Sequence, residues 1–128
     1  MKCLEEVVME DNRVEQKEAL ETLVEFNKRL VKNMGIIISE LSGQRMEDTD
    51  KFLKSIIDAM NWEIAVMNGT MELLNEGKER ICKDVFNQKV MVFGDAIKEK
   101  DDKKMAKALE MLVPEFTKLG DAAKEVVK

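Results

Sequence analysis

Between Thr49 and Gly77 the chain carries an apolar stripe at helical spacing, which constrains the fold more than any other feature of the sequence. The apolar positions recur at intervals of three, four and seven residues, which places them on one face of a helix. They are Leu53, Ile56, Met60, Met67, Met71 and Leu74, with Phe52, Ile57 and Ile64 widening the same face. Because Thr49 is suited to begin a helix and Gly77 to end one, the pattern predicts a central helix over 49–76.

Three further segments show the same periodicity, and short polar stretches separate them. We predict helices over 13–41, 49–76, 79–100 and 103–126. Helices of similar length joined by short loops are typical of an antiparallel up-down-up-down four-helix bundle. The low contents of Pro and Gly, one and six residues, favour helix throughout. The predicted fold class is therefore an all-α bundle, in a single domain over residues 1–128.

The segment 1–12 has one apolar face over Leu4, Val7 and Val8, and the polar pair that follows interrupts it. We expect a short N-terminal helical segment here, and its role stays open. It is a short helix packed loosely on the bundle, the first turns of the helix that follows, or an arm that docks on a partner subunit.

Two residues mark special positions inside the predicted helices. Asn27 falls on the apolar face of the first helix, where a polar residue fixes the pairing register at some cost in stability. Pro114 lies inside the last helix and removes one backbone hydrogen bond, so we expect a kink or break near Val113. Gly120 could shorten the same helix.

A very short turn near Gly77 would make the second and third helices antiparallel neighbours. This folding would set Trp62 opposite Phe93 and Gly94. We hypothesise that the missing side chain at Gly94 makes room for the indole ring. Cys82 is expected to be a small buried apolar residue.

Charge and cysteine content exclude several classes of protein. With 21 basic and 26 acidic residues the net charge is −5, which argues against a nucleic-acid binder. No apolar run reaches the roughly 20 residues that span a bilayer, and the acidic N-terminus lacks a signal-peptide core. Cys3 and Cys82 form no close-spaced motif, so we expect reduced thiols in the cytoplasm, although a bridge between them is possible in principle.

Histidine is absent, which removes the commonest general base and metal ligand. No Ser-His or Cys-His nucleophile, ferritin-like di-iron site, phosphate-binding loop or dinucleotide fingerprint can be built from this sequence. A calcium loop starting at Asp48 fails because Leu53 replaces the required glycine and Asn61 the final glutamate. We therefore expect no enzymatic activity, catalytic residue, metal or cofactor.

Six residues are candidates for a partner or ligand surface: Met60, Trp62, Glu63, Met91, Asp95 and Met111. Glu63 and Asp95 border apolar stripes, and if both faced inward they could share a proton or hold a cation; otherwise they reach solvent. Methionine is abundant, with ten residues, and adapts to irregular partners. Met91 and Met111 lie at the outer flanks of their stripes, so their exposure would favour a partner surface over core filling.

The last third of the chain resembles an uncharacterised family of bacterial helical-bundle domains. The resemblance rests on Phe86 to Phe93, Asp95-Ala96-Ile97, the charged turn after them, Met105 to Glu110, and Pro114-Glu115-Phe116. It implies the fold and a bacterial origin, and it carries over no catalytic residue. A looser similarity exists to flagellar-export chaperones, which are small antiparallel bundles that bind helices of client proteins.

These observations lead to two hypotheses about function. The first is a non-enzymatic protein-interaction module, resembling a chaperone or adaptor, that forms a homodimer or binds a partner helix through an apolar face. The alternative is a regulatory bundle that holds a small molecule or cation between helices near Met60, Trp62 and Glu63.

Overall fold

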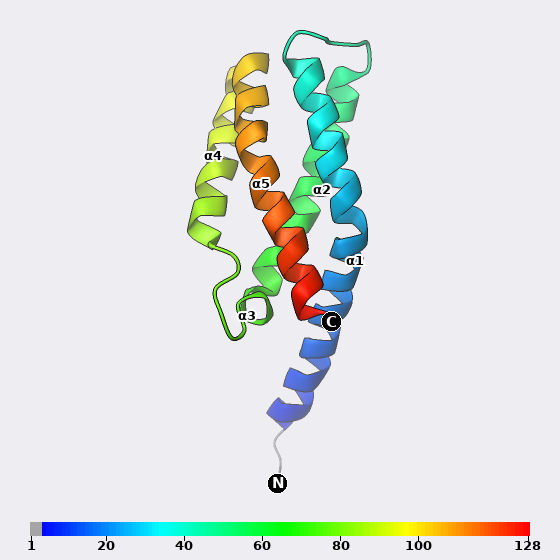
Figure 1. The fold of residues 1–128 in the computed structure, drawn as a ribbon, viewed down its shortest axis with the longest axis vertical. Helices are drawn as coiled ribbons and strands as arrows, with labels where there is room; N and C mark the ends of the chain where they lie inside the picture. The colour runs from blue at the N-terminus through cyan, green and yellow to red at the C-terminus, as the bar shows by residue number, and fades with distance from the viewer. Residues whose placement is uncertain (1–3) are drawn as a thin grey trace.

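The computed structural model describes the backbone of residues 4–128 and the side chains from Asn12 onward (Figure 1). Within this part of the chain the structure contains five α-helices and no strand, which confirms the all-α bundle predicted from the sequence. The helices are α1 (Leu4–Leu41), α2 (Thr49–Gly69), α3 (Met71–Leu74), α4 (Lys83–Glu99) and α5 (Asp102–Val126).

The helices α1 and α5 form the central pair of the bundle and contact each other over much of their length. α2 packs against α1, and α4 packs against α5. In Figure 1, α1 and α4 run toward one end of the molecule and α2 and α5 toward the other. α2 and α4 are not a packed pair, so the prediction that they would be direct neighbours is wrong.

The connection between α2 and α4 explains this difference. The predicted helix over 49–76 ends at Gly69, because the backbone of Thr70 leaves the helical conformation. The Thr70 hydroxyl donates to the Val66 carbonyl at 2.7 Å. The short helix α3 follows, and the predicted start of the next helix at residue 79 moves to Lys83. The segment 75–82 is a loop long enough to carry the chain to the far side of α5.

Asn75 holds this loop in one conformation. Its side-chain oxygen accepts from the backbone N–H groups of Arg80 and Ile81, each at 2.9 Å, and its amide donates to the Ile81 carbonyl at 3.0 Å. Gly77 adopts a φ of 84°, a left-handed conformation that glycine tolerates best. Cys82 ends the loop as an exposed free thiol, so the expectation that it is buried is wrong.

At the other end of the chain, α1 is continuous from Leu4. Of the three interpretations of 1–12, the described residues 4–12 fit the first turns of the following helix, and the polar pair does not interrupt it. Cys3 lies outside the described residues, and so does the predicted alternative of a bridge from it to Cys82.

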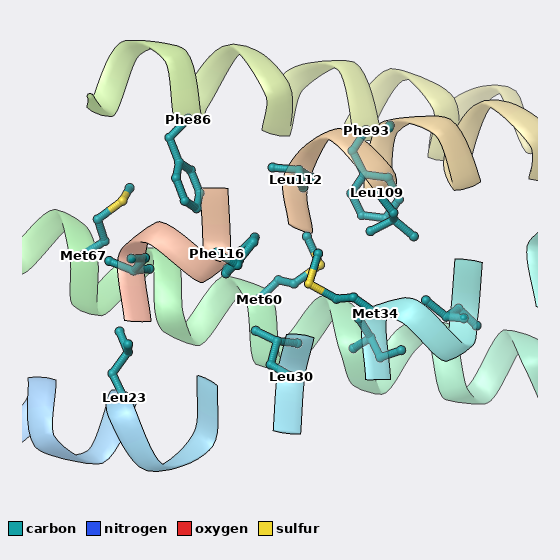
Figure 2. Packing of buried hydrophobic residues seen from close by; sticks show 14 of the residues in the cluster. Leu23, Leu30, Met34, Met60, Met67, Phe86, Phe93, Leu109, Leu112 and Phe116 are labelled. Atoms are coloured by element: carbon teal, nitrogen blue, oxygen red, sulfur yellow. The ribbon is translucent and has the colours of Figure 1, made fainter. Parts of the chain in front are cut away.

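The core contains the apolar faces predicted from the periodicity, brought together from all the long helices (Figure 2). Its labelled members are Leu23, Leu30, Met34, Met60, Met67, Phe86, Phe93, Leu109, Leu112 and Phe116. Phe86 of α4 meets Phe116 of α5 edge to face, with ring centroids 5.0 Å apart. This aromatic contact stabilises the packing of α4 against α5 in the core.

α5 continues through Pro114 to Val126, so of the kink or break expected near Val113 the break does not occur, and Gly120 does not shorten the helix. A proline inside a helix costs about 3 kcal/mol. Leu112 and Phe116 on either side of Pro114 are fully buried, and each such side chain contributes roughly 1.5–3 kcal/mol. Burial on both sides of the proline therefore outweighs its cost and keeps the helix continuous.

Gly120 marks the closest approach of α5 to α1. A Cβ atom added there would collide with the side-chain amide of Asn27. We predict that Gly120→Ala destabilises the protein by about 2–4 kcal/mol, because a group as buried as Asn27 cannot move away without losing its hydrogen bonds. Urea unfolding followed by circular dichroism measures this difference.

Gly35→Ala is the matched control, since an added Cβ on this exposed face of α1 meets no atom within 4 Å. It is expected to stabilise the protein by up to about 1 kcal/mol through its higher helix propensity. Equal effects of the two substitutions would contradict the assigned close contact.

Candidate functional site

A groove of about 300 Å³ opens between α1 and α2, and two of the predicted site residues, Trp62 and Glu63, line it. We call it the α1–α2 groove. Its other lining residues are Phe26, Arg29, Leu30, Asn33, Ser55, Ile56 and Ala59. Leu30 and Ile56 are buried core residues that form an apolar floor, and the polar side chains stand around it.

Trp62 and Phe26 form the aromatic wall of this groove. Their rings meet edge to face with centroids 6.2 Å apart, and Trp62 remains 41% exposed. The guanidinium carbon of Arg29 lies 5.6 Å from the centroid of the Phe26 ring, within the range of a cation–π interaction. Trp62 therefore packs against α1, and the hypothesis that it sits opposite Phe93 and Gly94 is wrong because α2 does not pack against α4.

Glu63 lies at the base of the groove with a relative exposure of 1%. The side-chain amide of Asn27 donates to Oε1 of Glu63 and to the backbone carbonyl of Phe116, both at 2.9 Å. One amide thus joins α1, α2 and α5 inside the core. Burial raises the pKa of Glu63 to about 7, and the hydrogen bond from Asn27 opposes part of this shift by favouring the ionised form.

The remaining predicted residues divide between the core and a different face. Met60 is buried in the core and offers no surface. Asp95 is exposed on α4, on the side that packs with α5. Glu63 faces inward and Asp95 does not, so the structure does not bring the two carboxyl groups together to share a proton or a cation.

A second groove, of about 510 Å³, runs between α4 and α5. Val92, Asp95, Ala96 and Glu99 line it from α4, and Lys104, Lys107, Ala108, Glu110 and Met111 line it from α5. Two of its lining residues, Val92 and Met111, are large exposed apolar side chains, and α4 carries two more, Val85 and Met91. We call the surface formed by the groove and these four residues the α4–α5 face.

Met91 and Met111, the pair singled out in the sequence, are 69% and 51% exposed. Neither belongs to the core, so core filling does not explain them. The charged residues of the groove are Asp95 and Glu99 on α4, and Lys104, Lys107 and Glu110 on α5. Within the protein, Lys104 reaches Glu99 at 3.2 Å across the end of the groove.

Sequence reasoning missed Phe26 and Arg29, which complete the α1–α2 groove. The spacing of Phe26, Asn33 and Ile36, at intervals of seven and three, indicates a second face on the first helix, and Arg29 lies on the same face three residues after Phe26. Among residues 12–128 no group of three Asp, Glu or Cys side chains is arranged to hold a metal ion. None of the helices in the described part of the chain is long and apolar enough to cross a membrane.

Comparison with known proteins finds one family, described as "Domain of unknown function (DUF8042)", which matches residues 18–122. The resemblance to an uncharacterised family is confirmed, but it extends from α1 to α5 and is not limited to the last third of the chain. No curated protein and no solved structure matches the chain. None of these comparisons links it to flagellar-export chaperones.

The buried carboxyl of Glu63 predicts an unusual dependence of stability on pH. Its pKa is about 7 in the folded protein against an ordinary value of 4.5, so between these values the unfolded chain releases a proton that the folded chain retains. Stability therefore falls as pH rises from about 4.5 to about 7, by up to about 3 kcal/mol. Urea unfolding at a series of pH values measures this loss.

Glu63→Gln keeps the acceptor for Asn27 and removes the ionisation. We expect the variant to be more stable than wild type by about 1–3 kcal/mol at pH 8, with the difference disappearing near pH 4. Asp58→Asn, at an exposed position on the same helix, controls for the loss of one charge. If the difference in the free energy of unfolding between Glu63→Gln and wild type stays constant with pH, the assignment of a raised pKa to Glu63 is wrong.

Proposed function

Because this chain belongs to the DUF8042 family, whose function is unknown, we propose a function from its own surfaces: it is a non-enzymatic interaction module that binds a second copy of itself through the α4–α5 face. The single observation that carries the proposal is the composition of that face. Its exposed apolar centre lies beside the acidic pair Asp95 and Glu99 on α4 and the basic pair Lys104 and Lys107 on α5.

The apolar centre supplies the driving force for association. Val92 and Met111 lie at the groove between the helices, and Met91 and Val85 extend the surface along α4. Fully burying one side chain of this size contributes roughly 1.5–3 kcal/mol. A dimer would bury these four apolar residues of each copy at the same time, and the flexible methionines can adapt to an imperfect fit.

The two charged pairs favour a second copy over a partner of unrelated chemistry. Two identical faces related by a two-fold axis contact each other through the same residues. When the axis is parallel to the helices, α4 of one protomer lies over α5 of the other, so Asp95 and Glu99 meet Lys104 and Lys107 of the partner subunit. An axis across the helices would oppose α4 to α4 and place like charges together, which is unfavourable.

The non-enzymatic part of the proposal rests on the chemistry of the side chains. The sequence contains no histidine, and the one strongly perturbed carboxyl among the described residues, Glu63, is held by Asn27 inside the core. A cytoplasmic location and the bacterial origin implied by the sequence resemblance are part of the same proposal. The exposed free thiol of Cys82 suits a reducing compartment.

Sedimentation equilibrium over a micromolar concentration series tests the self-association. We expect the average mass of the wild-type protein to rise toward that of a dimer, and Met111→Glu to remain monomeric because it places a charge at the apolar centre. Met46→Glu is the matched control, since Met46 is also an exposed methionine and lies in the loop between α1 and α2. A wild-type protein that stays monomeric throughout would overturn the proposal.

A charge exchange tests the orientation of the two copies. Asp95 and Lys107 line the same groove from opposite helices. We predict that Asp95→Lys and Lys107→Glu each weaken dimerisation by about tenfold, on the order of 1.4 kcal/mol, and that the double variant recovers most of the loss. If the double variant dissociates as readily as the single ones, the two-fold axis parallel to the helices is wrong.

A further inference from the structure

The α1–α2 groove combines two features that the α4–α5 face lacks, an aromatic wall and a buried acid. Oε1 of Glu63 accepts from Asn27, and no hydrogen bond within the described part of the chain occupies Oε2. Glu63 is one of the residues that line the groove, and its carboxyl lies at the base, where it is almost fully buried. The groove therefore offers a free acceptor at the end of an apolar floor.

The aromatic wall favours a positive charge on what enters. The electron-rich faces of Trp and Phe attract cations, and Trp does so most strongly. The guanidinium of Arg29 already uses this attraction at Phe26, where it lies 5.6 Å from the ring centroid. The indole of Trp62 lies beside it and meets the Phe26 ring in an edge-to-face contact, and 41% of the Trp62 surface stays exposed to a ligand.

We propose that the α1–α2 groove binds a small organic amine, with its ammonium group at Glu63 and its apolar or aromatic body against Phe26 and Trp62. The volume of about 300 Å³ is at the lower end of ligand pockets, which suits a molecule built on a single ring. This site lies on α1 and α2, so it goes beyond the proposed self-association through α4 and α5.

An amine fits the groove better than an acid of the same size. An anion at the base of the groove would be repelled by the ionised carboxyl of Glu63. The positive charge of Arg29 could attract an anion, but Arg29 is exposed, so solvent and salt screen its charge. A cation meets Glu63 where screening is weak. Asn33 and Ser55 are the neutral polar side chains on the groove, and they can accept further hydrogen bonds from an ammonium or hydroxyl group.

The bound amine would convert Glu63 to its ionised form. A neighbouring positive charge favours the carboxylate, so binding releases the proton that burial otherwise keeps on Glu63. Arg29 from α1 is the other charged side chain on the groove, and the contact from α5 is the neutral carbonyl of Phe116. Affinity is therefore expected to rise as pH increases through about 7.

Trp62 provides the readout, because it is the only tryptophan and the chain has no tyrosine. The test titrates the protein with phenethylamine, the neutral analogue 2-phenylethanol and the anionic analogue 3-phenylpropionate, and follows the fluorescence of Trp62. We expect phenethylamine to bind at least about tenfold more tightly than either analogue, a difference of about 1.4 kcal/mol. Equal binding of the three, preference for the acid, or no saturation by the amine at millimolar concentrations would overturn the proposal.

Two variants and one control distinguish the contribution of the Glu63 carboxyl to binding from that of the shape of the groove. Glu63→Gln is expected to abolish the preference for the amine while retaining the weak binding of the alcohol, and Asp58→Asn, outside the groove, should keep the preference. Ala59→Leu fills the groove beside Trp62 without replacing Glu63, and it should weaken all three ligands. An amine preference that survives Glu63→Gln in a folded protein would contradict the site.

The dimerisation variant keeps the two proposals distinguishable. Met111→Glu changes the α4–α5 face and leaves the α1–α2 groove intact, so it should bind phenethylamine as wild type does. Loss of binding in this variant would show that the amine site depends on the dimer and would overturn its assignment to α1 and α2 of one chain.

Discussion

The side-chain amide of Asn27 is the interaction on which the rest of the structure depends. It donates to the Glu63 carboxyl and to the Phe116 carbonyl, so three helices are joined by one buried group. A buried polar group is stable only when it is hydrogen-bonded, and each alternative register of α1, α2 or α5 would leave it without partners. The absence of a side chain at Gly120 lets α5 approach closely enough for this contact.

The close contact between α1 and α5 also decides where the surfaces lie. With these two helices at the centre, α2 covers α1 and α4 covers α5, and each outer pair leaves its own groove. The α1–α2 groove has an aromatic wall and a buried acid, whereas the α4–α5 face has exposed methionines and valines beside an acidic pair on α4 and a basic pair on α5. The two surfaces therefore suit different occupants, a small cation and a self-complementary protein face.

Much of the fold could be predicted because helical periodicity is a local signal. Leu20, Leu23, Met34 and Ile37 recur on one face, and all four are fully buried. The polar exception, Asn27, was recognisable for the same reason. The errors fall at the end of α2, where Thr70 leaves the helical conformation and the hydrogen bonds of Asn75 hold the loop that follows. The spacing of apolar residues does not indicate hydrogen bonds between side chains and the backbone.

The sequence by itself determined that this chain is helical, which residues form most of its core, and that histidine-dependent chemistry is absent, because composition and spacing act within one helix. Only the tertiary structure decided that Trp62 meets Phe26 and that Glu63 is buried while Asp95 is exposed. These outcomes depend on which helices pack together, and the periodicity of a single helix does not specify its neighbours. The close contact at Gly120 and the hydrogen bonds of Asn27 hold α1, α2 and α5 in the observed arrangement.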